Sequence, residues 1–409
     1  ALLLAVIVFQ YMIIKIDKDK RHEAGHDKLT GLCNPEHLMQ KMKELPDKKK
    51  NRLIIYSDIA EFKLINEILL KQADIIKKHA VDGYLYGRVG EDHFVVIADE
   101  ATFNEEYLYE CRETLQNVLS DSVYNVRVCF GIYRTDNMNE SLSFMCDKAS
   151  FAVASIKDDT HSFIAYYDDT MLEAAIKYKT IVDEFDDAIK AGEFKMYLQP
   201  QISAKTRRLT GAEALVRRIK PDGTIISPID FIPVYEKSGL ISRLDRYIWE
   251  QAAAKLGEWK KAGINMSISV NISPKDFYYI DIFNTFAGLI KKYDIEPSNL
   301  KIEITETTIM SDVPNLMGEL EELRKAGFTL EMDDFGSGYS SLNTLKDINV
   351  DVLKVDMGFI KETKNVKKSR IILASVIKMA KELNLLIITE GVETEEQVDN
   401  LTKLGCDVF

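Results

Sequence analysis

The chain has 409 residues, of which 46% are hydrophobic and 29% charged, a composition typical of a folded globular protein with two or three domains. Its formal net charge of −12 argues against a general nucleic-acid-binding protein, because an acidic surface repels phosphate. The five cysteines are scattered without paired spacing, which indicates reduced thiols in a cytosolic compartment and neither a disulfide framework nor a zinc site.

The first residues differ in texture from the rest of the chain. Residues 1–14, ALLLAVIVFQYMII, are almost wholly apolar but fall short of the roughly 20 residues that span a bilayer. Four basic residues follow directly, as on the cytoplasmic side of a membrane helix: Lys15, Lys18, Lys20 and Arg21. We therefore expect residues 1–14 to be the end of a transmembrane helix, residues 15–26 to be a linker, and the protein to be membrane-anchored with its remaining domains in the cytoplasm. The alternative is a buried helix of a soluble domain.

A first folded block is expected over residues 27–169. Strand-like runs such as RLIIYSDI, HFVVIAD and VRVCFGIY alternate there with helical stretches, which predicts an α/β sandwich with one mixed sheet. The following stretch, MLEAAIKYKTIVDEFDDAIKAGEF, has the periodicity of a long amphipathic helix that ends at Gly192. We interpret residues 170–193 as a connecting helix between two domains.

From residue 194 to 409, seven strand candidates alternate with helices, which is the pattern of a (β/α) barrel. The strands are KMYLQPQ, TGAEALVR, MSISVNIS, LKIEITET, FTLEMDDFG, DVLKVD and LLIITEG. Nearly all carry polar residues toward their C-terminal ends: Glu213, Asn271, Glu303, Asp333, Asp334, Lys354 and Glu390. In a barrel these ends meet on one face, where active sites are built.

The chemistry of this polar set points to divalent metal ions. Oxygen-rich ligand sets suit Mg²⁺ or Mn²⁺, and an aspartate that bridges two ions about 3.5–4 Å apart makes a site that cleaves phosphate esters. All six histidines precede the predicted barrel, which excludes Ser-His-Asp and Cys-His catalysis and histidine-ligated metal sites for this domain. Cations between Asp333 and Asp334 would also explain how two adjacent acids are tolerated.

The motifs of this second block are specific to one protein family. TGAEALVR, SVNIS, KIEITET, EMDDFGSGYSS, VLKVD and TEGVET together resemble the EAL phosphodiesterase domain, from about Phe194 to the end of the chain. The resemblance implies a modified (β/α)8 barrel, hydrolysis of cyclic di-GMP to linear pGpG with two Mg²⁺ or Mn²⁺ ions, and a homodimer. The chain stops at LGCDVF, where the family continues into its last barrel strand, so we expect a truncated barrel with unpaired edges. Arg218 stands where the family commonly has tryptophan.

The resemblance also implies roles for individual residues. Glu213, Asn271 and Glu303 would hold one ion, Asp333 would bridge both, and Asp334 and Glu390 would hold the second. Lys354 would position or activate the attacking water, so that Glu213, Lys354 and Glu390 form the catalytic set. Substrate contacts fall to Gln199, Leu215 and Arg217, and Glu306 would steady the DDFGSGYSS loop. A receptor that binds cyclic di-GMP without cleaving it is the alternative; because such receptors usually lose a metal ligand, the complete set favours an enzyme.

The first block resembles the GGDEF diguanylate cyclase domain through DKLTGLCN, SDIAEFKLIN and RVGEDHF. Its signature is degenerate, because Glu91 replaces a glycine that lets the backbone approach a triphosphate, and His93 replaces an acid. Asp58 and Asp92 remain and could ligate one metal ion. Val81 and Tyr84 stand at the charged positions of the family's inhibitory Arg-x-x-Asp site. The resemblance therefore implies an inactive, regulatory domain, with GTP as the ligand that it could still bind.

Overall fold

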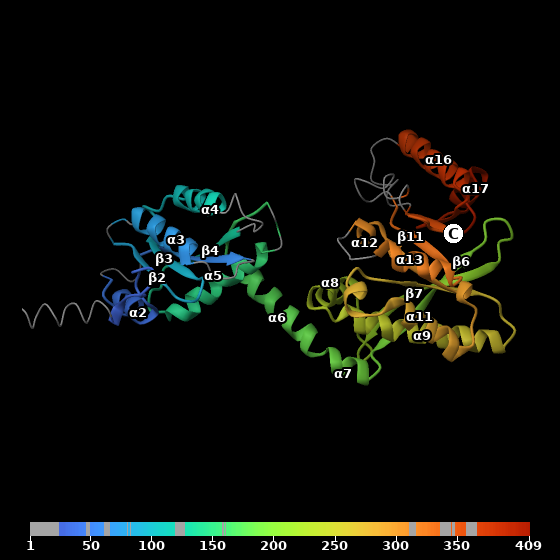
Figure 1. Ribbon diagram of the computed structural model, residues 1–409, viewed down its shortest axis with the longest axis horizontal. Helices are drawn as coiled ribbons and strands as arrows, with labels where there is room; N and C mark the ends of the chain where they lie inside the picture. The colour runs from blue at the N-terminus through green and yellow to red at the C-terminus, as the bar shows by residue number, and fades with distance from the viewer. Residues whose placement is uncertain are drawn as a thin grey trace, which may run out of the picture. The chain divides into compact units, whose positions relative to one another are not determined.

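The computed structural model describes residues 24–45, 50–60, 66–79, 81, 83–118, 127–157, 159, 161–310, 316–335, 345, 348–356 and 366–409 (Figure 1). The chain divides into an N-terminal unit, Ala1–Tyr178, and a C-terminal unit, Lys179–Phe409. Within the part of the chain that is described, no helix is both long and apolar enough to cross a bilayer. The predicted end of a transmembrane helix, residues 1–14, lies outside the described residues.

The N-terminal unit contains one five-stranded mixed sheet, as the sequence predicts. Its strands lie in the order β2-β3-β1-β4-β5, and β4 and β5 are the only parallel pair among the described strands of this sheet. Their bounds are β1 (Arg52–Ala60), β2 (Leu85–Arg88), β3 (Phe94–Asp99), β4 (Arg127–Thr135) and β5 (Ile164–Tyr166).

Helices cover both faces of this sheet (Figure 1). They are α2 (Pro35–Lys43), α3 (Asn66–Lys78), α4 (Glu106–Val118) and α5 (Leu142–Ile156). Successive strand residues point to opposite faces, so Leu53 and Ile55 of β1 join the core under α3 and α4, whereas Ile54 joins the core under α2 and α5. Gly131 lets β4 approach α5 closely, because a Cβ there would lie 1.8 Å from the carbonyl oxygen of Ala149. The alternating apolar pattern thus produces a three-layer sandwich.

The connecting segment forms two helices instead of the single helix that was expected. Helix α6 (Asp169–Asp183) ends before Glu184, and the short α7 (Phe185–Lys190) follows. Gly192 adopts a positive φ of 66°, which ends the helical segment just before the first strand of the C-terminal unit.

All seven predicted strands are present in the C-terminal unit, in one sheet of order β13-β12-β11-β10-β9-β7-β6 with β8 attached to β7. They are β6 (Phe194–Ile202), β7 (Leu209–Ile219), β8 (Ile225–Ile226), β9 (Ser267–Asn271), β10 (Leu300–Thr305), β11 (Leu330–Asp333), β12 (Val352–Asp356) and β13 (Leu386–Glu390). Strands β7 and β9–β13 are parallel, but β6 runs antiparallel to β7, which the sequence pattern did not predict.

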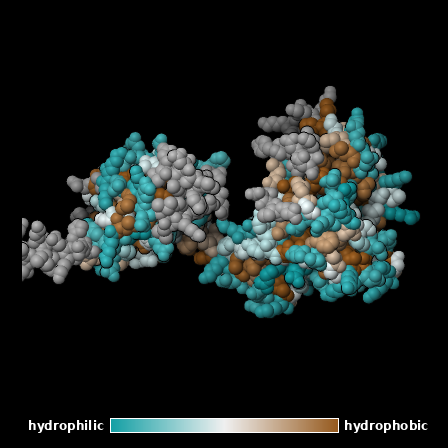
Figure 2. Space-filling model, in the orientation of Figure 1, coloured by the Kyte–Doolittle hydropathy of each residue, from teal (hydrophilic) through white to brown (hydrophobic). Residues whose placement is uncertain are grey.

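Helices and one short 3-10 turn connect these strands. They are α8 (Pro228–Ser238), α9 (Ile241–Lys261), α10 (Asp276–Tyr279), α11 (Ile282–Tyr293), η1 (Pro297–Asn299), α12 (Glu306–Met310), α13 (Leu316–Lys325), α16 (Val366–Glu382) and α17 (Glu395–Leu404). On the face shown in Figure 2, hydrophilic residues cover much of the described surface of each unit, with apolar residues interspersed.

The last residues of the chain contact both edge strands of the sheet, which corrects the expectation of unpaired edges. Val408 forms β-bridges with Ser203, just after β6, and with Ile388 of β13. Phe409 and Ile202 exchange two backbone hydrogen bonds of 2.9 Å. Residues 406–409 therefore join the two edge strands, and the sheet curls into a barrel.

The strands of this barrel alternate between an apolar face and a polar face. Ile268, Val270, Ile302, Ile304, Leu330, Met332, Leu353 and Val355 belong to the hydrophobic core that the strands share with the helices. The residues between them are polar: Ser269, Lys301, Glu303, Glu331 and Lys354. Because the side-chain period of a strand is two, these polar residues share the opposite face and are gathered inside the barrel.

Candidate active site

Four carboxylates surround the ammonium group of Lys354 inside the barrel. The Lys354 Nζ atom lies 3.0 Å from Glu213 Oε2, 3.1 Å from Glu303 Oε1, 3.3 Å from Asp333 Oδ1 and 2.7 Å from Glu390 Oε1. These residues come from different strands that are widely separated in sequence. The fold therefore gathers the predicted acids around one point.

The strand register explains this convergence. Glu303 of β10 stands beside Asn271 of β9, and Thr305 of β10 stands beside Asp333 of β11. Parallel strands in this register bring their carboxyl ends to the same mouth of the barrel. Asn271 also points its amide at the cluster, since its Nδ2 atom lies 3.4 Å from Glu213 Oε1. The Trp249 indole supports this position by donating to the Asn271 carbonyl oxygen at 2.9 Å.

The cluster is deeply buried, and its charges perturb one another. The side chains of Lys354 and Glu303 are 1% and 0% exposed. Although burial alone lowers the pKa of Lys354, the surrounding carboxylates, Glu303 foremost, raise it well above its usual value. Burial and the neighbouring acids raise the pKa of Glu303 well above its usual value, and raise the pKa of Glu390 to about 7, against the opposing effect of Lys354. Without cations, the site therefore favours extra bound protons.

The donor set fits divalent cations. Neither carboxylate oxygen of the fully buried Glu303 accepts a hydrogen bond with good geometry, although Lys354 lies close. A buried acid with unfilled acceptor capacity is costly unless a cation satisfies it. Carboxylate and amide oxygens are the ligands that Mg²⁺ and Mn²⁺ prefer. The residues that offer such oxygens here are Glu213, Asn271, Glu303, Asp333 and Glu390.

Asp334 lies at the edge of this set and has unusual backbone geometry. Its φ is 54°, which is uncommon for a residue other than glycine, and its backbone N–H donates to Asp333 Oδ1 at 2.9 Å. Partial burial, followed by the charge of Asp333, raises the pKa of Asp334. The rest of the DDFGSGYSS loop, residues 336–341, lies outside the described residues.

The predicted substrate-contacting residues lie on the first two strands. Leu215 and Arg217 follow Glu213 at intervals of two on β7, so they share its face, and Gln199 of β6 stands directly opposite Glu213. The Arg217 Nη1 atom donates to the carbonyl oxygen of Val216 at 2.7 Å. Glu306 is buried at the start of α12. Its proposed partner, the loop that it would steady, includes residues outside the described part of the chain.

A cavity of about 270 Å³ adjoins the acid cluster. Asn271 and Leu215 line it together with Trp249, Thr305 and the half-buried acid Asp245. The cavity thus extends from the ends of β7, β9 and β10 toward α8 and α9.

The sequence reasoning missed a second polar layer just below the acids. Glu331 is fully buried, stands beside Glu303 in the strand register, and accepts from Ser269 Oγ and Lys301 Nζ, each at 2.8 Å. Although burial alone raises the pKa of Glu331, the charge of Lys301 and the side chains of Glu303, Lys301 and Ser269 leave it lowered. The available signal was the spacing, because Glu331 precedes Asp333 by two residues and therefore shares its face.

The N-terminal unit brings together the remaining residues of the degenerate cyclase signature. Ligand atoms of Asp58, Asp92 and His93 all lie within 4.8 Å of one another. The His93 Nε2 atom is 3.3 Å from Asp92 Oδ1 and 3.9 Å from Asp58 Oδ1, and Lys157 Nζ lies 3.0 Å from Asp58 Oδ2. The two predicted metal-binding acids therefore already have basic neighbours. Glu91 is exposed in the turn directly before Asp92.

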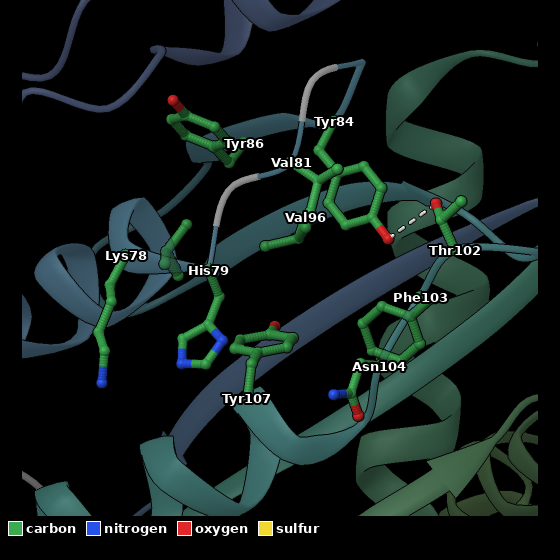
Figure 3. Close-up of a pocket in the computed structure, with 11 residues that line it drawn as sticks. Lys78, His79, Val81, Tyr84, Tyr86, Val96, Thr102, Phe103, Asn104 and Tyr107 are labelled. Atoms are coloured by element: carbon green, nitrogen blue, oxygen red, sulfur yellow. Dashed lines mark hydrogen bonds between the residues drawn. The ribbon is translucent and has the colours of Figure 1, made fainter.

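A cavity of about 320 Å³ occupies another part of the N-terminal unit (Figure 3). Val81, Tyr84, Phe103 and Tyr107 are among its lining residues, and the Tyr84 hydroxyl lies 3.2 Å from Thr102 Oγ1. Val81 and Tyr84, which stand at the charged positions of the family's inhibitory Arg-x-x-Asp site, thus border a cavity lined by a mixture of aromatic, aliphatic and polar side chains.

Comparisons with known proteins agree with this division of the chain. Residues 182–409, more than half of the chain, match the family model of the EAL domain, and residues 24–162 match that of the diguanylate cyclase, GGDEF domain. Similar curated proteins include the signaling protein YkoW of Bacillus subtilis, 29% identical over 96% of this chain and 52% of its own length. The bifunctional diguanylate cyclase/cyclic di-GMP phosphodiesterase MucR of Pseudomonas aeruginosa is 28% identical over 94% of this chain and 59% of its own length. The chain thus spans about half the length of these relatives.

Solved structures show the same similarity. The PaMucR phosphodiesterase in complex with c-di-GMP is 33% identical, with a TM-score of 0.53 over 56% of this chain and 93% of that one. The S helix-GGDEF-EAL portion of Vibrio cholerae LapD, bound to c-di-GMP, is 20% identical, with a TM-score of 0.50 over 97% of both chains, and shares the fold.

Proposed function

Because this chain belongs to the EAL domain family and carries a GGDEF domain ahead of its EAL domain, we propose that its C-terminal unit hydrolyses cyclic di-GMP to linear pGpG. The observation that carries the proposal is the convergence of four carboxylates from four strands around Lys354, with Asn271 beside them. Receptors that lack catalysis are expected to lose part of this set.

The proposed chemistry divides between two divalent cations and the residues of the chain. When bound, two Mg²⁺ or Mn²⁺ ions lower the pKa of an attacking water and offset charge that develops on the phosphoryl oxygens. Glu213, Asn271 and Glu303 would hold one ion, Asp334 and Glu390 the other, and Asp333 both. The burial of Glu303 and Lys354 at the centre of this set provides a low-dielectric setting in which their charges act strongly.

Lys354 has two roles in this proposal. Before the cations bind, its ammonium group neutralises part of the charge of the acids, as the short distances indicate. With cations bound at the acids, the Lys354 N–H groups would donate to the attacking water and orient it toward phosphorus. Leu215 and the adjoining cavity would receive one guanine, and Arg217 would contact a phosphate oxygen.

Product analysis tests this function. The full chain is stripped of metal, supplied with Mg²⁺ or Mn²⁺ and cyclic di-GMP, and its products are separated by liquid chromatography. We expect pGpG, and we expect Glu213→Ala to reduce its formation by at least about 100-fold, since losing a ligand of a two-metal site costs several kcal/mol. Glu396→Gln, at an exposed position in the first turn of α17, is the matched control and should retain full activity.

The same experiment separates the enzyme from the receptor. Tight binding of cyclic di-GMP by the wild-type chain, with no pGpG formed in either metal, would support the receptor and overturn the proposed hydrolysis. Equal rates in the wild-type chain and the Glu213→Ala variant would show that the assignment of the metal ligands is wrong.

We further propose that the N-terminal unit makes no cyclic di-GMP and acts as a regulatory or dimerising domain. Glu91 adds a charged side chain in the turn that would receive a triphosphate, and Asp58 already contacts Lys157. The test uses the Glu213→Ala chain, in which any product would persist, incubated with GTP and Mg²⁺. Formation of cyclic di-GMP would refute this proposal. A change in the phosphodiesterase rate of the wild-type chain on addition of GTP would show regulation.

We also propose that the protein is attached to a membrane through its N-terminal segment. It rests on the apolar residues 1–14 and the basic residues that follow them. Fractionation of cells that produce the full-length protein tests it, and recovery of the protein wholly in the soluble fraction would refute it.

A further inference from the structure

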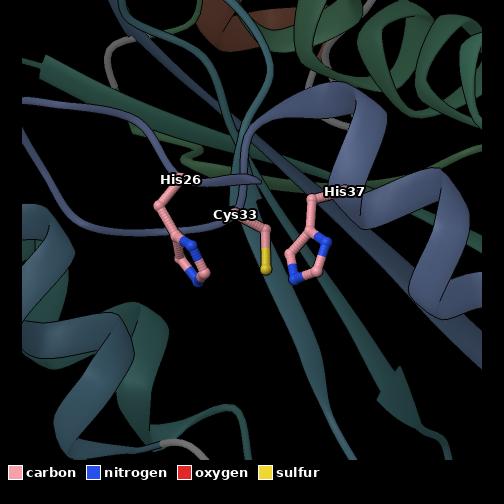
Figure 4. Close-up of side chains that lie close together, drawn as sticks. All are labelled: His26, Cys33 and His37. Carbon is pink, nitrogen blue, oxygen red and sulfur yellow. The ribbon is translucent and has the colours of Figure 1, made fainter. Parts of the chain in front are cut away.

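Three potential metal ligands converge in the N-terminal unit and form a group separate from Asp58, Asp92 and His93. His26, Cys33 and His37 each offer one ligand atom, and these atoms all lie within 4.8 Å of one another. Figure 4 shows the Cys33 sulfur between the two imidazole rings. The rings are 5.1 Å apart between centroids and are tilted by 53°. A set of one thiol and two imidazoles differs in kind from the acids of the EAL domain.

The backbone around these residues is firmly organised. His26 and Cys33 form an antiparallel β-bridge, and the Cys33 carbonyl oxygen accepts from the Arg88 N–H of β2 at 2.9 Å. The Asn34 N–H donates to the Gly25 carbonyl oxygen at 3.0 Å, which closes the turn between them. All three ligands thus project from a scaffold held by main-chain hydrogen bonds, as a preorganised site requires.

The third ligand is positioned by the start of helix α2. The Asn34 side chain caps this helix by accepting from the His37 N–H at 2.9 Å. The His37 ring packs against Gly25, where an added Cβ would lie only 3.0 Å from His37 Cγ. The absence of a side chain at Gly25 therefore gives the ring room to face Cys33.

The chemistry of this set selects the ion. Thiolate and imidazole ligands suit Zn²⁺, whereas Mg²⁺ and Mn²⁺ prefer oxygen. Three protein ligands leave a fourth tetrahedral position for water or another group. Cys33 is 4% exposed, while the two histidines are half-buried, so the sulfur is shielded and an ion can enter past the rings.

We propose that His26, Cys33 and His37 form a Zn²⁺ site in the N-terminal unit. Bound Zn²⁺ would tie the segment that enters the domain to α2 and, through Cys33, to β2. The turn that it closes also holds Asp27, whose carboxylate accepts from Arg88 at 3.2 Å, three residues before Glu91 of the degenerate signature. Metal occupancy would therefore stabilise the part of the domain that carries this signature.

Cobalt is a suitable probe, because Co²⁺ bound to a thiolate absorbs in the near-ultraviolet whereas Co²⁺ bound only to oxygen and nitrogen lacks that band. The full chain is reduced, stripped of metal and titrated with Co²⁺ in excess Mg²⁺, which occupies the acidic sites. We expect the thiolate band to saturate at one Co²⁺ per chain and to disappear when Zn²⁺ is added. We also expect Zn²⁺ to raise the melting temperature of the N-terminal unit.

Three variants locate the sulfur and the imidazoles. Cys33→Ser should abolish the band, and His37→Gln should weaken Co²⁺ binding by on the order of 100-fold, at least the loss that a supporting residue of a metal site causes. Cys146→Ser is the matched control, because Cys146 is a half-buried cysteine of the same unit outside the cluster, and it should leave the titration unchanged. Circular dichroism verifies the fold of each variant, and His37→Gln serves if Cys33→Ser does not fold.

Absence of a thiolate band in the wild-type chain would overturn this proposal. A band that survives Cys33→Ser, or that is lost in Cys146→Ser, would also overturn it, since the sulfur would then come from another residue. Neither result would affect the proposed phosphodiesterase, whose acidic site contains no sulfur.

Discussion

Replacing Lys354 with methionine tests the electrostatics of the acid cluster most directly. The substitution keeps the apolar stem and removes an ammonium group that is 1% exposed and lies within 3.3 Å of Glu213, Glu303, Asp333 and Glu390. Four carboxylates against one ammonium leave a formal charge of −3, and the substitution removes the only positive charge among these five groups. Breaking a buried ion pair by removing one partner typically costs about 3–5 kcal/mol.

We therefore expect Lys354→Met to lower the unfolding free energy of the C-terminal unit by about 3–5 kcal/mol at pH 8 in the presence of EDTA. Because the pKa of Glu303 is already raised, proton uptake by the acids would keep the loss of unfolding free energy near the lower end of this range. Urea unfolding, followed by circular dichroism, measures the change. Mg²⁺ should stabilise the variant more than the wild-type chain, because a cation can replace the missing charge and meets no competing ammonium group.

Lys301→Met is the matched control for this effect. Lys301 also pairs with a buried acid, since its Nζ atom lies 2.8 Å from Glu331 Oε1, but it stands one layer below the predicted metal ligands. The control should lose stability equally in EDTA and in Mg²⁺. The reasoning would be refuted if Lys354→Met were as stable as the wild-type chain in EDTA. It would also be refuted if Mg²⁺ reduced the stability loss of Lys354→Met and that of Lys301→Met by the same amount.

Further predictions concern pH and stability. Burial raises the pKa of Asp276 to about 6, so the folded chain favours the protonated form, and ionisation of Asp276 lowers the stability as pH rises. In urea unfolding, Asp276→Asn should therefore stabilise the chain by about 1–3 kcal/mol at pH 8 but not near pH 4. Asp281→Asn, at the exposed N-cap of α11, is the control and should change the stability little. Burial raises the pKa of Glu390 to about 7, so protons compete with Mg²⁺ for this carboxylate below that pH. The affinity for Mg²⁺, measured by calorimetry, should fall by up to about tenfold per pH unit below 7, and equal affinities at pH 6 and pH 8 would contradict this. Arg218 is buried and pairs with two carboxylates at 2.7 Å and 2.9 Å, so Arg218→Met should cost about 3 kcal/mol, and an unchanged melting temperature would contradict that assignment.

The elements and most of the candidate site were predictable from the amino-acid sequence. Strand-like runs that alternate with helices predicted the seven main strands of the second domain, and the polar residues toward the C-terminal ends of those strands indicated Glu213, Glu303, Asp333, Lys354 and Glu390 as a set. This succeeded because side-chain periodicity is local, and because parallel strands necessarily bring their carboxyl ends to one mouth of a barrel.

Contacts between distant segments became visible only in the folded molecule. The fold places Val408 between β6 and β13, puts Glu331 beside Glu303, and brings His26 and His37 to either side of Cys33. No spacing rule reveals these contacts, because each depends on how whole elements pack, on strand register and on the closure of turns. Local chemistry chose the residues, and packing over long sequence separations chose their neighbours.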